Sequence, residues 1–138
     1  MSNKKSTLFC FCILILSLVL LVSCKSKSTN TNINPKNTSK VSIKTQMTTP
    51  PSMKLITEKA DIEKAVNFLN SIKFKSTSQK DIKGWQYWIQ FSCDKEYSIS
   101  FIGNKVELND KLYEIDEDVL KELDKLFKSL NYAEEPIK

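Results

Sequence analysis

Cysteine thiols are the strongest nucleophiles in this 138-residue chain, and they are unevenly placed. Cys10, Cys12 and Cys24 lie near the N-terminus, and Cys93 stands alone in the remainder. The chain has 21 Lys, no Arg and no His, so no thiol or hydroxyl has an imidazole to act as its general base. We therefore expect no catalytic residue, no metal site and no cofactor, and a hydrolase is the least favoured function class.

The N-terminal residues have the pattern of an export signal. Lys4 and Lys5 precede an apolar run, residues 8–22, in which only Ser17 is polar. A helix over this run would be about 22 Å long, short of the roughly 30 Å hydrocarbon core of a bilayer. A basic start and a short apolar run ending in small residues are typical of a signal peptide, residues 1–23, and less typical of an uncleaved membrane anchor.

The end of this run carries the most specific motif. Leu21-Val22-Ser23-Cys24 resembles the lipobox of bacterial lipoproteins, with an aliphatic residue first, a small residue third and Cys last. The resemblance implies cleavage between Ser23 and Cys24 and attachment of diacylglycerol to the Cys24 thiol. It implies a protein held by this lipid on the outer face of the bacterial cell membrane, since two acyl chains give stable anchoring.

The composition and three short motifs point in the same direction. The signal, together with a Lys-rich chain that lacks Arg, resembles small Gram-positive lipoproteins. Three motifs are similar to small uncharacterised Firmicute lipoprotein domains, and this second resemblance implies no activity. They are Lys83-Gly84-Trp85, Phe101-Ile102-Gly103 and Leu112-Tyr113.

Residues 24–52 have the composition of a disordered tether behind the lipidated cysteine. Ser, Thr, Asn, Lys and Pro dominate, and Ile33, Val41, Ile43 and Met47 are the only sizeable apolar side chains. Such a segment buries too little apolar surface to offset its ordering entropy. The alternation over residues 41–46 leaves an additional edge strand open as an alternative.

The distribution of charge argues against a nucleic-acid partner. The net charge is +5, yet residues 57–138 hold 13 Lys and all 16 acidic residues. A nucleic-acid-binding domain needs a basic surface on its fold, and here the excess of Lys lies ahead of the expected domain. The expected partners are therefore the membrane, through the lipid on Cys24, and an envelope protein, peptide or glycan.

Residues 53–138 carry the periodic apolar patterns of a small α+β domain. Apolar residues at helical spacing predict helices over residues 58–72 and 116–130. Alternating residues predict strands over 85–91, 97–102, 105–108 and 111–115, with turns at Gly103-Asn104 and Asn109-Asp110, and a short strand over 53–56. The expected fold is (β)αβββα, an antiparallel sheet of three to four strands with two helices on one face.

The outer face of this sheet is the candidate binding surface. Alternation points Trp85, Tyr87, Ile89 and Phe91 to the core, and it places an aromatic ring among polar side chains on the opposite face. The ligand-binding candidates are Trp88, Gln86, Gln90, Ser98 and Ser100. The alternative is that Trp88 packs under a loop or the N-terminal segment. Cys93 is expected to be a small buried side chain, and a reactive or intermolecular thiol is the alternative.

Two functions remain in competition. The first is a membrane-anchored, extracytoplasmic binding module for a cell-envelope ligand or protein. The second is an immunity or exclusion lipoprotein, which sequesters a toxic peptide or blocks an invader at the membrane. Both need a lipid anchor and a small domain, and neither needs catalytic residues.

Overall fold

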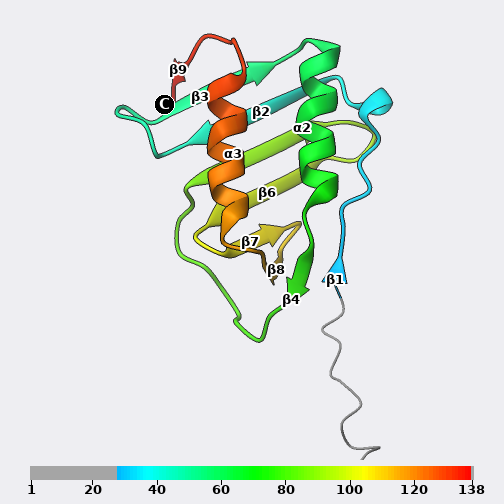
Figure 1. Ribbon diagram of the computed structural model, residues 1–138, viewed down its shortest axis with the longest axis vertical. Coiled ribbons are helices and arrows are strands. Elements are labelled where there is room, and N and C mark those ends of the chain that lie inside the picture. Colours follow the sequence, from blue (N-terminus) through cyan, green and yellow to red (C-terminus); the bar gives the residue numbers. More distant parts are fainter. Residues whose placement is uncertain (1–27, 138) are drawn as a thin grey trace, which may run out of the picture.

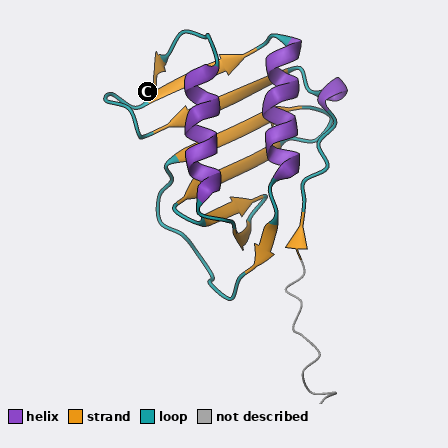
Figure 2. Cartoon of the chain, viewed as in Figure 1, coloured by secondary structure: helices purple, strands orange, loops and turns teal. Residues whose placement is uncertain are grey.

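A computed structural model describes residues 28–137 of the chain, which form one antiparallel sheet with two helices on one of its faces (Figures 1 and 2). The sheet has nine strands in the order β1-β4-β8-β7-β6-β5-β2-β3-β9. Every pair of neighbouring strands is antiparallel. The mixed α+β character and the position of both helices agree with the sequence analysis.

The strands differ widely in length. The long central ones are β2 (Lys40–Thr45), β3 (Ser52–Ile56), β5 (Tyr87–Ser92) and β6 (Tyr97–Ile102). Shorter ones are β4 (Phe74–Ser76), β7 (Lys105–Leu108) and β8 (Lys111–Glu114). Two-residue strands, β1 (Ser28–Thr29) and β9 (Glu135–Pro136), close the two edges.

The two α-helices lie side by side across the sheet. The first, α2 (Lys59–Ser71), follows β3, and the second, α3 (Asp118–Ser129), follows β8; a single 3-10 turn, η1 (Pro35–Asn37), precedes β2. Asp118 at the start of α3 and Lys128 in its last turn complement the helix dipole. Neither helix is long and apolar enough to cross a membrane.

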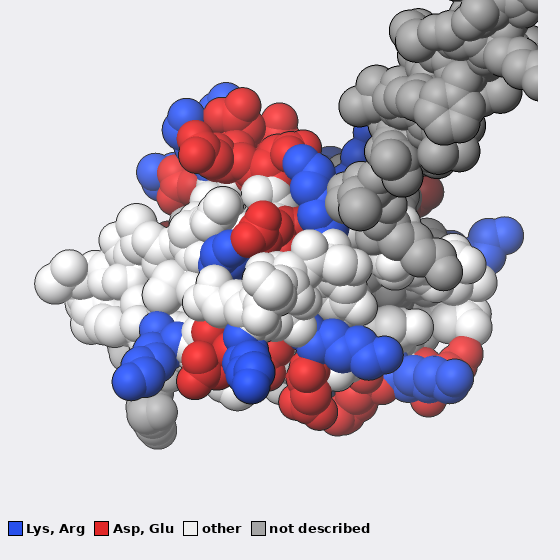
Figure 3. Space-filling model, turned by 90° about the horizontal axis from the view of Figure 1, so that it is seen from below, with Lys and Arg blue, Asp and Glu red and all other residues white. Residues whose placement is uncertain are grey.

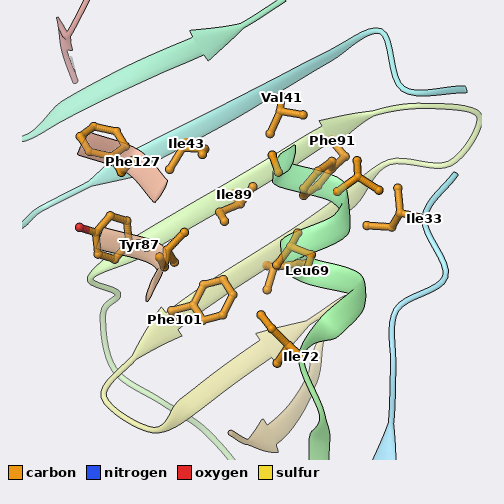
Figure 4. Close-up of a cluster of buried hydrophobic side chains, with 14 of the residues drawn as sticks. Ile33, Val41, Ile43, Leu69, Ile72, Tyr87, Ile89, Phe91, Phe101 and Phe127 are labelled. Atoms are coloured by element: carbon orange, nitrogen blue, oxygen red, sulfur yellow. The ribbon is translucent and has the colours of Figure 1, made fainter. Parts of the chain in front are cut away.

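The core fills the layer between the helices and the sheet (Figure 4). Its sheet side comes from alternate strand residues, among them Val41, Ile43, Ile89 and Phe101, each no more than 1% exposed. Leu69 of α2 and Phe127 of α3 pack onto them from the helical layer. This burial explains why both helices are amphipathic and why buried and exposed residues alternate along the long central strands.

The expectation of a three- to four-stranded sheet is wrong, and the largest cause is β2. This strand lies inside the segment expected to be a disordered tether, yet it pairs with β3 on one side and β5 on the other. Val41, Ile43 and Thr45 are fully buried. The alternative of an extra strand over residues 41–46 was right about the strand, but the strand is central and not at an edge.

The folded unit also extends further towards the N-terminus than expected, because residues 28–34 are fixed to the domain. Asn70 of α2 receives a hydrogen bond from the Ile33 amide at 3.0 Å and donates one to the Ile33 carbonyl at 2.8 Å. Thr31 donates to the Leu69 carbonyl. A disordered tether is therefore wrong for residues 28–52. The signal peptide, the lipobox and Cys24 lie outside the described residues.

The two expected turns are confirmed. Gly103 has a φ of +54°, and Asn109 and Asp110 have φ values of +47° and +64°. Backbones of this hand suit two-residue hairpins, in which Gly and Asn are favoured. The turn at Gly103-Asn104 pairs Ile102 with Lys105, as the apolar pattern required.

Candidate functional site

One face of the sheet carries no helix. Both helices cover the opposite face, so the outward side chains of the central strands form a surface that no described element covers. Trp88, Gln90, Ser98 and Ser100 all project to this side, since they alternate with buried neighbours on β5 and β6. The prediction that these four residues lie on the outer face of the sheet is therefore confirmed.

Two rows of side chains cross this face at right angles to the strands. The first row is Leu55, Ser42, Gln90 and Ser98, from β3, β2, β5 and β6. The second row is Met53, Lys44, Trp88 and Ser100, from the same strands. In each row the residue from β3, Leu55 or Met53, is apolar and lies at one end.

A groove of about 310 Å³ follows the first row, and we call it the outer groove. Gln90 and Ser98, both predicted binding residues, line it. Its other lining residues come mainly from β2, β3 and the end of the β5–β6 hairpin. They are Lys40, Ser42, Lys44, Met53, Leu55, Phe91, Ser92, Glu96 and Tyr97.

Ser42, which lines the outer groove, has a buried side-chain hydroxyl group. Its hydroxyl oxygen is inaccessible to solvent and has no hydrogen-bond partner among the described residues. A buried hydroxyl without a partner costs about 1–3 kcal/mol. Gln90, which is opposite Ser42 on β5, and Ser98 supply further hydrogen-bonding groups in the same row.

Charged side chains border the groove without neutralising one another. Lys40, Lys44 and Glu96 line it, and none of the three forms an ion pair within residues 28–137. A groove with two amines, one carboxylate, three serine hydroxyls and an amide can hydrogen-bond to a polar ligand in many ways. Leu55, 41% exposed, adds an apolar wall.

Trp88 is half-buried and held in place by three neighbours. Its indole nitrogen donates to the Ser98 hydroxyl at 2.7 Å, and Trp85 contacts it edge-on with ring centroids 5.9 Å apart. Lys44 Nζ lies 4.5 Å from its ring centroid, within cation–π range. One ring face is thus occupied by Lys44, so Trp88 is a fixed wall beside the groove and not a bare stacking platform.

Two sequence-based assignments need correction. Trp85 does not belong to the buried core, because β5 begins only at Tyr87 and the alternation does not extend back to residue 85. Gln86 does not line the outer groove. Its side-chain oxygen accepts from the Gly103 amide at 2.7 Å, which ties the start of β5 to the β6–β7 turn.

Ser100 lies in the second row beside Trp88 and outside the lining of the groove. Of the five predicted binding residues, Gln90 and Ser98 therefore line the outer groove, and Trp88 is joined to it through Ser98. Ser42, Lys40 and Lys44 were not among the predicted binding residues, because their segment was expected to be a tether or, as the alternative, a strand at the edge of the sheet. Their alternation with Val41 and Ile43 was the available signal.

A second hollow of about 400 Å³ lies at the left end of the strands in Figure 1, between the β2–β3 loop and α3. Met47, Tyr87, Leu120 and Asp124 contribute to its lining. The Tyr87 hydroxyl donates to Asp124 at 2.7 Å. Burial, and then this carboxylate, raise the pKa of Tyr87, while Lys128 and then Tyr87 lower the pKa of Asp124.

The acidic residues around the start of α3 are held by lysines. Lys75 contacts Asp116 at 2.5 Å, and Lys105 contacts Glu114. Each lysine is the main cause of a lowered pKa in its carboxyl partner. Residues 28–137 contain no cluster of three or more metal-ligating side chains.

Cys93 is half-buried beside the core, and it has no disulfide partner in the described part of the chain. Its thiol donates to the Lys95 carbonyl at 2.7 Å.

Figure 3 views the molecule from below, the end at which α3 begins, and shows Lys and acidic side chains next to each other on that side.

No family model, curated protein or solved structure matches the chain.

Proposed function

We propose that this protein is a lipid-anchored binding module on the outer face of the bacterial cell membrane. The outer groove engages a ligand of the cell envelope that offers closely spaced hydroxyl or amide groups, as a glycan strand does. The lipobox at Cys24 supports the anchor, and the open face of the sheet supports the binding role.

The observation that carries the binding role is the outer groove on the uncovered face of the sheet, lined by Gln90 and Ser98 and bordered by charged side chains that form no ion pair within residues 28–137. Gln90 and Ser98, which line the groove beside the enclosed Ser42 hydroxyl, supply an amide and a hydroxyl for a ligand's hydroxyl or amide groups. Lys44, Trp88 and Ser98 form a connected arrangement beside it, which is already in place before a ligand binds. A site of this kind loses little freedom on binding, which favours affinity.

The anchor is tested by mass spectrometry of the N-terminal peptide from membranes of a Gram-positive host that expresses the full chain. We expect the mature protein to begin at Cys24 with a diacylglyceryl thioether. Cys24→Ala should leave an unlipidated precursor, whereas Cys93→Ala should be processed normally. A mature protein with an unmodified Cys24 thiol would contradict the anchor.

Binding is tested by sedimentation of the full chain, in mild detergent, with purified peptidoglycan sacculi. Gln90→Ala should weaken binding about fivefold for each hydrogen bond lost, since one such bond contributes about 1 kcal/mol. Gln46→Ala is the matched control, because Gln46 is exposed next to β2 and does not line the outer groove. Equal binding of the two variants would overturn the assignment of the groove.

A further inference from the structure

The place where the described chain begins limits how far the domain can stand from a lipid on Cys24. Ser28 and Thr29 pair with Lys75 and Phe74 of β4, so the chain joins the sheet at the β1 edge. The contacts of Thr31 and Ile33 with α2 then hold the following residues in place. The folded domain therefore already includes Ser28, well before residue 53.

Three residues, 25–27, separate Cys24 from Ser28. Four steps between consecutive Cα atoms span at most about 14 Å, even in a fully extended chain. A disordered tether over residues 24–52 would have allowed roughly 30 Å on average. With lipid on Cys24, the β1 edge must lie within about 14 Å of the point where the lipid leaves the membrane.

The loop after β4, residues 77–86, lies at the same end of the molecule as β1 and extends below β1 in the view of Figure 1. Lys80 and Lys83 in this loop are exposed, and neither forms an ion pair within residues 28–137. The loop has one acid, Asp81. A Lys near an anionic lipid surface contributes about 1 kcal/mol of attraction.

Acidic residues also lie at this end, since α3 begins there. Asp116 and Glu114 are paired with Lys75 and Lys105, and Asp118 is paired with Lys121 at 3.2 Å. These pairs reduce the repulsion between this end and anionic lipid, and Glu117, exposed between Asp116 and Asp118, is left without an ion pair within residues 28–137. The attraction is thus confined to the loop and is not a property of the whole end, in agreement with the mixed charges of Figure 3.

We propose that the domain stands on the membrane with β1, β4 and loop 77–86 against the anionic lipid headgroups and with the β3–β9 edge pointing away. This orientation rests on the proposed lipidation of Cys24. Nine strands at about 4.8 Å spacing extend roughly 38 Å, so the outer groove lies about 20–35 Å from the β1 edge. The short link keeps the groove clear of lipid and open to the envelope.

The orientation is tested by quenching of a thiol-reactive fluorophore by lipids with spin-labelled headgroups. The full chain carries Cys93→Ser and one new cysteine, at Ser78→Cys in the loop or at Thr57→Cys next to the far edge. Both positions are exposed. We expect several-fold stronger quenching of the label at residue 78, and equal quenching at the two positions would overturn the proposal.

Two further variants test the cause. About 20 Gly/Ser residues inserted between Lys27 and Ser28 should make the two labels equally quenched, whereas the same insertion after Lys138 should change nothing. Lys80→Glu with Lys83→Glu should reduce the quenching at residue 78, and the matched pair Lys59→Glu with Lys125→Glu should not. A difference between the two labels that the insertion before Ser28 leaves unchanged, or quenching at residue 78 that the loop substitutions leave unchanged, would overturn the proposal.

The same samples separate failure of this proposal from failure of the proposed function. Mass spectrometry of the N-terminal peptide reports whether Cys24 carries lipid. Absence of lipid contradicts the anchor itself. Lipid on Cys24 together with equal quenching of the two labels contradicts only the orientation.

Discussion

Lys54 donates a hydrogen bond from its ammonium group to the carbonyl oxygen of Leu130 at 2.8 Å, beneath the C-terminus of α3. A second bond of 2.8 Å reaches the Phe127 carbonyl, and the Lys54 side chain is only 6% exposed. The last carbonyls of a helix have no partners within the helix and carry a partial negative charge. The buried lysine of β3 satisfies two of them and joins α3 to the sheet.

Lys54→Met should therefore destabilise the domain although it retains an apolar side chain of similar length. Two buried carbonyl groups lose their donor, and the expected loss is about 2–4 kcal/mol in the free energy of unfolding. Urea denaturation followed by circular dichroism measures it. Lys59→Met, at an exposed position, should change the free energy of unfolding by less than about 0.5 kcal/mol. Equal effects would contradict the role of Lys54.

A fragment that begins at residue 53 should not fold cooperatively. It lacks β2, so β3 and β5 lose the strand that lies between them, together with the fully buried side chains of Val41 and Ile43. A fragment of residues 28–138 retains the whole described sheet and should show a single sharp urea transition. A cooperative transition of the shorter fragment would show that β2 is dispensable.

Trp88 and Phe101 should differ in their contribution to stability. Phe101 is fully buried, and Phe101→Ala should cost about 3–5 kcal/mol. Trp88 is half-buried, and Trp88→Ala removes its contact with Trp85 and its bond to Ser98, at about 1–2 kcal/mol. Urea denaturation of both variants checks this, and equal losses would mean that Trp88 belongs to the core.

Tyr87→Phe should remove a stabilising contribution that depends on pH. Lys128 and Tyr87 hold the pKa of Asp124 below its ordinary value of 3.8. A carboxyl group with a lowered pKa in the folded state stabilises the fold above that value, and the contribution is lost as the pH falls through the folded pKa. We expect a cost of about 1 kcal/mol at pH 7 that shrinks below about pH 4.

The measurement is urea denaturation of the wild-type chain and the variant between pH 3 and pH 7. Tyr97→Phe is the control, since the Tyr97 hydroxyl forms no hydrogen bond within the described residues. A difference between Tyr87→Phe and wild type that stays constant down to pH 3 would contradict the role of the Asp124 carboxylate.

The sequence predicted the two helices, the hairpins from β5 to β8 and the open face, because their apolar residues recur at regular spacing. It offered β2 only as an alternative, an additional edge strand over residues 41–46. Half of that strand, Lys40, Ser42 and Lys44, faces outward on a sheet with one open side, so only Val41 and Ile43 remain as apolar signals. Two-residue strands such as β1 and β9 are too short to produce any pattern.

The candidate site was predictable only where its strands were. Gln90, Ser98 and Trp88 lie on β5 and β6, which the alternation identified. Ser42 comes from β2, and its partner Leu55 comes from β3, so their meeting with Gln90 depends on long-range pairing that local patterns do not encode. Trp85 was misplaced because a pattern does not mark the residue at which a strand starts.

The position of β2 also determines the order in which the sheet can be completed. Val41 pairs with Phe91, so β2, which is synthesised early, cannot pair with β5 until residues near position 91 have been synthesised. A chain that emerges N-terminus first leaves one edge of β2 unpaired until β5 has followed. Pairings between distant residues slow folding, because the loop between them must close first. The growing chain therefore stays open to proteases and chaperones until about two-thirds of it has emerged.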